Sequence, residues 1–462
     1  MGQELLVQAI VHVPLCSTMK DLSFKHIGSL AIPAIVSGIT EPILSATDAA
    51  VVGNIPVNAT EALAAVGVVG ALLSTLIWVL AQTRSAIATI VAQNLGAGKI
   101  KSLNGFPGQA IVFNVSLGII VLLITSVFVQ EIFGLLNASG LVLEYSMSYY
   151  NIRVWGFPFT LFVFAVFGVF RGLQNTFYPM LVAGSGALIN IVLDFIFVFG
   201  LGPIPAMGIE GAAWASLIAQ ILMALAVLWL YVLKTPLNLN LGKAVHFEIS
   251  RLLNMTGHLI LRSLALNAVL ILAVREANAI SPEAMAAHTI AINIWLFSAF
   301  FIDGFGAAGN LIGGKLLGAK RYFDLWILTK KVNGYNLIIA GLLMLIGGLT
   351  YVPLGRVFAQ DPEVLPQFYG VFFLLVLIQP FNALAFTLDA IFKGLGEMAF
   401  LRNSLFIAAI FGFGPWIAAT HYFNWGLKGI WWALLAWIIC RALVLMVKFR
   451  KDYYPLALAQ KN

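Results

Sequence analysis

Residues 108–130 read GQAIVFNVSLGIIVLLITSVFVQ, an apolar run without a charged side chain. A helix needs about 20 mostly apolar residues to cross a bilayer, whereas the strands of a transmembrane barrel alternate polar and apolar residues. The run therefore predicts a spanning helix and excludes a transmembrane barrel. The whole chain shares this character, because 61% of its 462 residues are hydrophobic and 10% are charged, against about 25% charged in a typical soluble domain. Soluble enzymes and nucleic-acid-binding proteins are excluded, so no nucleic-acid partner is expected.

Similar apolar runs, separated by Gly, Pro, Asn and charged residues, predict an all-α polytopic membrane protein with twelve transmembrane helices. The predicted spans are 27–52, 63–95, 108–130, 150–173, 178–201, 211–233, 256–279, 285–314, 333–354, 367–392, 403–421 and 430–447. Several runs exceed the length that a bilayer requires, so we expect these helices to tilt or to extend beyond the hydrocarbon.

The basic residues set the orientation. With the N-terminus inside, 19 of the 26 Lys and Arg residues fall in inner segments and 4 in outer segments. Basic residues accumulate on the cytoplasmic side of membrane proteins. The sequence therefore predicts a multi-pass protein of the plasma (inner) membrane with both termini in the cytoplasm. The net charge of +7 is read as a topology signal.

The chain also repeats itself at nearly constant offsets. Three pairs of segments carry the repeat: Leu95-Gly96-Ala97-Gly98-Lys99 with Leu317-Gly318-Ala319-Lys320-Arg321, Phe170-Arg171-Gly172-Leu173 with Phe392-Lys393-Gly394-Leu395, and Gly208-Ile209-Glu210-Gly211 with Gly426-Leu427-Lys428-Gly429. Because six spans per half is an even number, both halves share one orientation. They are expected to be related by a pseudo-two-fold axis along the membrane normal. Two six-helix lobes that rock around a central cavity are typical of a transporter.

The domain boundaries follow from the repeat. We expect a cytoplasmic lead (1–23, with Met1 or Met19 as the start), a first lobe (24–233), a cytoplasmic linker (234–255), a second lobe (256–450) and a cytoplasmic tail (451–462). Cys16 and Cys440 are the only cysteines and lie near opposite ends of the chain. Two such residues provide neither a disulfide framework nor a metal site.

Ionisable residues inside spans are costly and are usually functional or paired. In the inner half of the membrane, Arg84 is expected to reach Glu41, and Arg262 to reach Asp303 or Asp389. These inner charge pairs are interpreted as neutralising contacts that fix helix register or form an inner gate.

Asp48 and Asp194 fall in the outer half of the first lobe, where Arg153 near the membrane surface is the only basic candidate. Desolvation disfavours the charged form of a buried carboxyl group, so such an acid can hold a proton and release it when wetted. Asn190 and Asp194 are four residues apart and share a helix face. Carboxylate, amide and hydroxyl oxygens also suit Na⁺. We therefore expect a proton site here, with Na⁺ at Asp48, Asn190 and Asp194 as the alternative.

Neither acid is duplicated. At an offset of 222 residues, Leu270 corresponds to Asp48 and Trp416 to Asp194. The scaffold repeats but the acid pair does not, so coupling chemistry is expected in the first lobe alone.

Several motifs in order resemble the multidrug and toxic compound extrusion (MATE) family. They are Arg171-Gly172-Leu173-Gln174-Asn175-Thr176, Asn190-Ile191-Val192-Leu193-Asp194 and Gly211-Ala212-Ala213-Trp214-Ala215-Ser216. Glu41-Pro42 followed by Thr47-Asp48, together with Ala286-Ala287-His288 and Asp303-Gly304-Phe305, resembles the DinF-type branch. The resemblance covers roughly residues 24–450. Asn175 replaces the usual Asp, and Lys393 also departs from the pattern, both at the expected cytoplasmic surface.

The resemblance implies proton- or Na⁺-coupled efflux of amphipathic, often cationic, small molecules from a membrane-lipid environment. It assigns ion coupling to Asp48, Asn190 and Asp194, more weakly to Ser216, and leaves Glu41 as a further candidate. No cofactor or bound metal is implied beyond the coupling ion, and we expect a monomer.

Three other classes of membrane protein share part of this pattern. A major-facilitator carrier would have a basic Gly/Asp signature after the second span, which the loop 96–102 lacks. A lipid-linked precursor flippase of the same superfamily would favour an arginine-rich cavity for phosphate, and Arg84 and Arg262 are the available arginines. A membrane enzyme is not expected, because no span pairs a nucleophile with a base and His288 stands alone.

Overall fold

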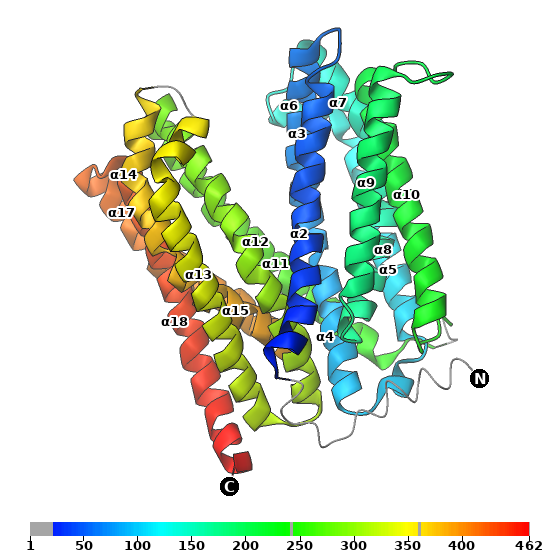
Figure 1. The fold of residues 1–462 in the computed structure, drawn as a ribbon, viewed down its shortest axis with the longest axis vertical. Helices are drawn as coiled ribbons and strands as arrows, with labels where there is room; N and C mark the ends of the chain where they lie inside the picture. Colours follow the sequence, from blue (N-terminus) through cyan, green and yellow to red (C-terminus); the bar gives the residue numbers. More distant parts are fainter. Residues whose placement is uncertain (1–21, 241–243, 359–361, 462) are drawn as a thin grey trace. The chain divides into compact units, whose positions relative to one another are not determined.

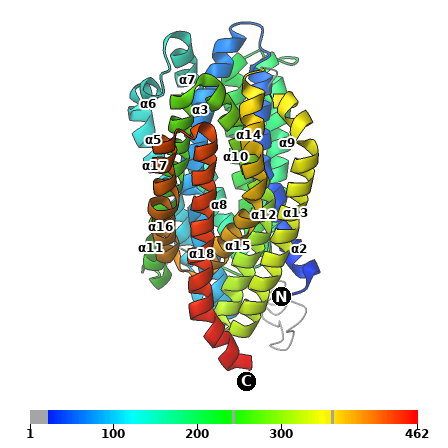
Figure 2. The same cartoon turned by 90° about the vertical axis from the view of Figure 1, so that its left-hand side faces the viewer.

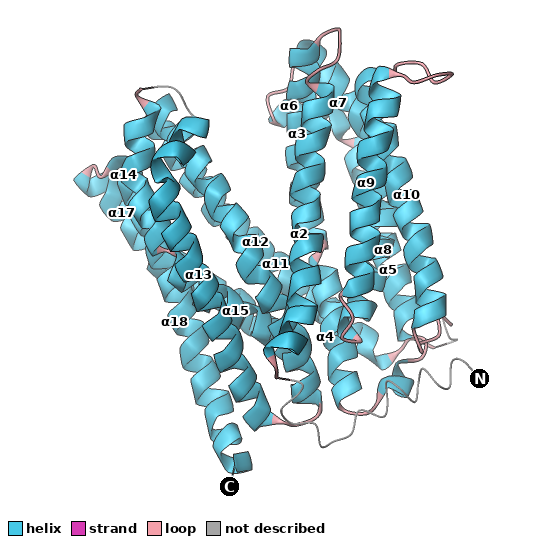
Figure 3. Cartoon of the chain, in the orientation of Figure 1, coloured by secondary structure: helices cyan, strands magenta, loops and turns pink. Residues whose placement is uncertain are grey.

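The computed structural model describes residues 22–240, 244–358 and 362–461, with the side chains of residues 41 and 42 left out. Within these ranges the chain forms helices joined by short loops (Figure 3). Ten helical segments there are long and apolar enough to cross a membrane, and two further spans are pairs of helices that bend sharply at a break. The predicted class, an all-helical multi-span membrane protein, is confirmed. Each of the twelve predicted spans falls on helix.

The described chain divides into two compact units. One unit comprises residues 36–254, and the other comprises residues 22–35 and 255–461. Two helices contribute to both units: α2 (Phe24–Val52) begins in the second unit, and α11 (Phe247–Ile280) begins in the first. Residues 24 and 256, where the predicted lobes begin, lie in α2 and α11.

The first unit is built from the later part of α2 and the helices that follow it along the chain (Figure 1). These are α3 (Ala59–Leu80), α4 (Gln82–Gly96), η1 (Ile100–Leu103), α5 (Phe106–Val127), α6 (Val129–Leu135), α7 (Gly140–Arg153), α8 (Gly156–Gly172), α9 (Phe177–Phe199) and α10 (Gly208–Lys234). A buried cluster that includes Phe133, Tyr149 and Tyr150 forms its core between α3, α6 and α7. Helices α9 and α10 run side by side, which positions the site described below.

The second unit contains most of α11 and the helices after it (Figure 2). These are α12 (Pro282–Gly318), α13 (Tyr322–Phe358), α14 (Val364–Leu377), α15 (Gln379–Leu395), α16 (Met398–Ile407), η2 (Ala408–Phe413), α17 (Gly414–Phe423) and α18 (Gly426–Lys461). Its core gathers around the buried indoles of Trp431 and Trp437 on α18.

Two spans are broken at corresponding places in the two units. Helices α7 and α8 meet at 48°, and α14 and α15 meet at 49°. Pro158 follows the first break and Pro380 the second, both within the first turn of the next helix. Proline lacks an N–H and is tolerated in the first turn of a helix but not in its interior. The bends therefore have a local cause that hydropathy alone does not report.

The segment predicted as a linker is attached to the first unit. Gln109 on α5 donates to the carbonyl oxygen of Ala244 at 2.9 Å and accepts from the His246 amide at 2.8 Å. Helix α11 begins at Phe247, inside the predicted linker, and Asn94 on α4 donates to Glu248 at 2.8 Å. Hydrogen bonds to loop carbonyls and to a helical carboxylate thus order this segment.

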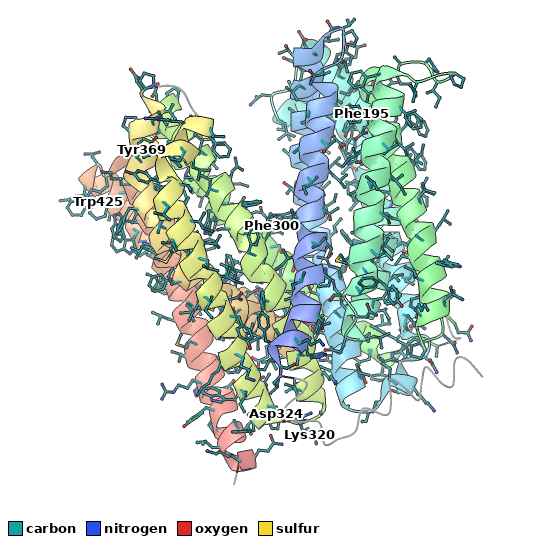
Figure 4. The ribbon with its side chains drawn as sticks, viewed as in Figure 1. Phe195, Phe300, Lys320, Asp324, Tyr369 and Trp425 are labelled. Atoms are coloured by element: carbon teal, nitrogen blue, oxygen red, sulfur yellow. The ribbon has the colours of Figure 1, made fainter. Side chains whose placement is uncertain are left out.

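The segment predicted as a tail is helical as far as Lys461, because α18 continues through it. The ring of Trp326 on α13 stacks on Phe449 with centroids 5.7 Å apart, and Gln460 donates to the Lys320 carbonyl oxygen at 2.9 Å. Figure 4 labels Lys320, in the loop between α12 and α13, and Asp324, in the first turn of α13. Aromatic packing and this hydrogen bond thus stabilise α18 through the segment predicted as a tail, residues 451–461.

Candidate functional site

Asp48 lies in the last turns of α2 and is 6% exposed. The hydroxyl of Tyr149 on α7 donates to Asp48 Oδ2 at 3.4 Å. Tyr149 belongs to the core of the first unit, so packing fixes its ring and thereby aims its hydroxyl. The sequence did not point to Tyr149, since nothing in its helical spacing indicates which neighbour it faces.

Asn190, Asp194 and Ser216 form a second group, on α9 and α10. Asn190 Nδ2 donates to Asp194 Oδ1 at 3.4 Å and to Ser216 Oγ at 3.2 Å. All three side chains are buried. The contact depends on close helix packing, because a Cβ at Gly211 would lie 2.6 Å from the Phe197 carbonyl.

The two groups meet. Asp48 lies within side-chain hydrogen-bonding reach of Asp194 and Ser216, and the charge of Arg153 acts on both acids. Within the described residues, Asp48 Oδ1 and Asp194 Oδ2 are buried and accept no hydrogen bond. Ionised carboxylates only accept hydrogen bonds, so a contact between two of them needs a proton or a cation. The structure thus brings together Asp48, Asn190, Asp194 and Ser216, four of the five residues predicted as an ion-coupling group.

A cavity of about 480 Å³ lies between α2 and α9 of the first unit, the helices that carry Asp48 and Asp194. It is lined from α2 by Ile43, Ala46, Thr47, Ala50, Val51 and Asn54, and from α9 by Phe195 and Phe199. The rings of Phe195, labelled in Figure 4, and Phe199 have centroids 6.1 Å apart. Aromatic faces and aliphatic side chains of this kind suit the apolar body of a small molecule.

The first inner pair falls partly outside the described structure. The side chain of Glu41 lies outside the described residues, so its predicted contact with Arg84 stays a prediction. The Arg84 guanidinium carbon lies 5.3 Å from the centroid of the Phe164 ring on α8.

The second inner pair joins Arg262 to Asp389. Arg262 donates to both oxygens of Asp389, with Nη2 at 2.7 Å from each. Of the two partners that the sequence left open, Asp389 is the one that Arg262 contacts in the described structure. Asp303 lies in the same electrostatic neighbourhood, together with Arg441 and Lys393.

Two further cations bind the same carboxylate. Arg441 Nη2 on α18 lies 2.7 Å from Asp389 Oδ1, and Lys393 Nζ lies 3.2 Å from Asp389 Oδ2. Lys393 was expected at the cytoplasmic surface; one helical turn separates it from Asp389, and its side chain is 18% exposed. Arg441 lies within the predicted span 430–447, but the sequence did not point to its contact with Asp389.

These helices and buried charges define an integral membrane transporter rather than an enzyme. The family profile described as MatE matches residues 33–196 and 259–415. The chain therefore belongs to the MATE transporter family, as its motifs suggested.

Relatives extend this result over nearly the whole chain. The protein is 30% identical over 433 residues to "Protein DETOXIFICATION 44, chloroplastic" of Arabidopsis thaliana, covering 90% of this chain and 80% of the relative. It is 25% identical over 457 residues to "DNA damage-inducible protein F" of Escherichia coli (strain K12), covering 95% and 94%.

Solved structures share the fold. A crystal structure of MATE in the bent conformation superposes with a TM-score of 0.87 at 20% identity, covering 95% of this chain and 97% of that one. An outward-facing conformation of a multidrug resistance MATE family transporter gives a TM-score of 0.84 at 20% identity, covering 94% and 96%.

Proposed function

We propose that the protein is a secondary active efflux antiporter that exports amphipathic, cationic small molecules in exchange for H⁺, with Na⁺ as the alternative coupling ion. The observation that carries the proposal is the pair of buried acids, Asp48 and Asp194, which two separate helices of one unit bring within reach of each other. Related proteins at 23–25% identity bear the name "Probable multidrug resistance protein NorM", which supports efflux as the direction.

Coupling requires a group whose ion occupancy changes the balance between two conformations, since equal affinity in both would shift nothing. A proton bound by either acid turns that acid into a donor to the other and removes the repulsion between them. A protonated pair can therefore stay dry. An ionised pair requires water, a metal cation or a cationic substrate beside it.

Sodium ion would use the same atoms differently. Asp48 Oδ1 and Asp194 Oδ2 provide hard oxygen ligands. Ser216 Oγ lies near them, because it accepts a hydrogen bond from the same Asn190 amide nitrogen that donates to Asp194. However, Asn190 directs its amide nitrogen, a donor, at Asp194. An amide nitrogen is not a ligand for Na⁺, so this orientation does not offer Asn190 as an oxygen ligand beside Asp194, and we favour H⁺.

The remaining features of the proposal concern the whole chain. We propose alternating access by rocking of two six-helix lobes, residues 24–233 and 256–450, in the plasma (inner) membrane, with both termini cytoplasmic and the protein monomeric. Membership of the MATE family removes the major-facilitator alternative, and it favours extrusion of small molecules over flipping of a lipid-linked precursor.

Transport in proteoliposomes tests the coupling ion. Vesicles loaded with the amphipathic cation tetraphenylphosphonium are given an imposed pH gradient, and in a second series an imposed Na⁺ gradient at constant pH. We expect movement of the cation to follow the pH gradient. Movement with the Na⁺ gradient alone would assign Na⁺ instead, and movement with neither would contradict antiport.

A further inference from the structure

The cavity between α2 and α9 is lined by side chains of which six are apolar and none is charged. The other two are Thr47, in the last two turns of α2, and Asn54, in the turn that follows the end of this helix at Val52. A lining without a charge cannot select a ligand by ion pairing. Selection among cations must therefore come from these two polar side chains and from the aromatic rings.

The hydroxyl of Thr47 has its only proton committed to the backbone. Thr47 Oγ1 donates to the carbonyl oxygen of Ile43, four residues earlier, at 2.9 Å. A hydroxyl has one proton to donate and two lone pairs that accept. The side chain is partly exposed, so a ligand can reach the oxygen. Toward the cavity, Thr47 can therefore only accept a hydrogen bond.

The amide of Asn54 has its orientation fixed in a similar way. Asn54 Nδ2 donates to the carbonyl oxygen of Ala50 at 2.7 Å. A carbonyl has no proton to give, so the amide must direct its nitrogen at this group, and Oδ1 is left for other donors. Thr47 and Asn54 together keep about four lone pairs that accept, against the one remaining N–H of the amide. The polar part of the cavity therefore favours a ligand that donates hydrogen bonds.

The opposite wall adds a preference for positive charge. Phe195 and Phe199 lie one turn apart on α9, and their side chains are 54% and 38% exposed. The face of an aromatic ring attracts a cation within about 6 Å of its centroid. Figure 4 labels Phe195 in the first unit. The group that suits both walls is an ammonium ion with an N–H, because the proton can be donated to an oxygen while the charge lies over a ring.

We propose that this cavity selects among cations by the N–H donor, and that Thr47 and Asn54 determine the selectivity. A protonated amine donates to Thr47 Oγ1 or Asn54 Oδ1, whereas a quaternary ammonium ion of similar size cannot. A cation without an N–H, such as tetraphenylphosphonium, still contacts the rings and the aliphatic wall but leaves the desolvated oxygens without a partner. The inference rests on the proposed function in taking the ligand to be a transported cation.

The test is a binding measurement with a matched pair of ligands and no ion gradient. The full-length protein in nanodiscs of phosphatidylcholine is titrated calorimetrically with benzyldimethylammonium and with benzyltrimethylammonium, and empty nanodiscs give the background. At about pH 7 the first ligand carries its N–H, because aliphatic amines have pKa values near 10. We expect the wild type to bind it about tenfold more tightly than the second, as a hydrogen bond from a charged donor predicts.

A double variant removes the acceptors. Thr47→Val combined with Asn54→Leu keeps the shapes of the side chains, and both cations should then bind about as tightly as benzyltrimethylammonium binds to the wild type. The matched control combines Thr40→Val with Asn267→Leu. These two side chains also donate to the carbonyl oxygen four residues earlier, and neither lines the cavity. The control should keep the tenfold preference of the wild type.

Equal affinity of the wild type for the two cations, or a preference that survives in the double variant, would overturn the inference. Binding of neither cation would also overturn it and would fit a lipid acyl chain as the occupant. If the double variant does not fold, the two single variants replace it, and a preference unchanged in both would be the contrary result. Because Asp48 and Asp194 are unchanged and no gradient is applied, failure of proton coupling would leave these titrations unaffected.

Discussion

The carboxylate of Asp389 joins three helices of the second unit by charge. It lies on α15 with Lys393, while Arg262 comes from α11 and Arg441 from α18. Buried charges are tolerated when they are paired and hydrogen-bonded. Removing one partner leaves the other charge buried and uncompensated, which destabilises the protein. The members of this cluster therefore differ in importance, since all three bases contact the one carboxylate of Asp389.

Asp389→Asn should destabilise the protein more than Arg262→Ala does. The first change leaves three cations without their shared counter-ion, at a cost of about 3–5 kcal/mol. The second change leaves Asp389 paired with Arg441 and Lys393. Thermal unfolding in detergent measures the order. Asp324→Asn, in an ion pair with Arg321 nearer the surface, is the control and should cost about 1 kcal/mol or less. The reverse order would mean that Asp389 is not the centre of the cluster.

At the acid pair, Tyr149→Phe should impair transport without unfolding the protein. The change removes the hydroxyl that donates to Asp48 Oδ2 and keeps the buried ring. We expect a stability loss of about 1 kcal/mol and a several-fold slower gradient-driven efflux from proteoliposomes. Tyr145→Phe on the same helix, whose hydroxyl accepts from Asn58, should transport normally. Equal rates in both variants would remove Tyr149 from the site.

At the scale of elements, the close approach of α9 and α10 sets the geometry of the site. Gly211 allows the α10 backbone to pack directly against the Phe197 carbonyl of α9. That approach brings Ser216 within hydrogen-bonding distance of Asn190. A side chain at residue 211 would push against the backbone, which cannot move aside as a flexible side chain can.

Gly211→Ala should therefore separate the two helices and lower stability by about 1–3 kcal/mol, the usual cost of overpacking. Gly184→Ala is the matched control, because a Cβ there meets nothing within 4 Å. It should be neutral or slightly stabilising, since alanine favours helix over glycine. Thermal unfolding of both variants in detergent gives the comparison. An unaffected Gly211→Ala protein would show that the helices have room between them.

The sequence predicts helical spans well, because each spanning helix must satisfy its own backbone hydrogen bonds and so carries a long apolar run. Bends are less visible, since Pro158 and Pro380 break spans whose hydropathy is continuous. Contacts between helices are even harder to predict from the sequence than bends. Asn190 and Asp194 could be grouped by their spacing on one helix, whereas the partners Tyr149 and Arg441 are reached only through the tertiary fold.

At the scale of the whole molecule, the two units share a helical plan but differ in their buried charged clusters. The first unit places two acids near Arg153, and the second places three bases around Asp389. At the repeat offset of 222 residues, Asp48 corresponds to Leu270 and Arg441 to Ala219. Lys393 corresponds to Arg171 and so belongs to the repeat, whereas Asp48 and Arg441 have no charged counterpart in the other unit.

The distribution of basic residues predicts the orientation of the whole chain. In a variant without Cys16 and Cys440, a cysteine at Asn240 should resist a membrane-impermeant maleimide in intact cells and react after lysis. A cysteine at Pro203, in the exposed loop between α9 and α10, should react in intact cells. The opposite labelling pattern would reverse the assigned topology.

The central claim is that Asp48 couples ion binding to transport, and one variant tests it most directly. Asp48→Asn keeps the shape of the side chain but cannot ionise. In proteoliposomes under an imposed pH gradient, we expect this variant to lose gradient-driven export of tetraphenylphosphonium while still binding it, and Glu131→Gln, at an exposed acid, to export at the wild-type rate. Wild-type export by Asp48→Asn would contradict the account and leave Glu41 as the next candidate.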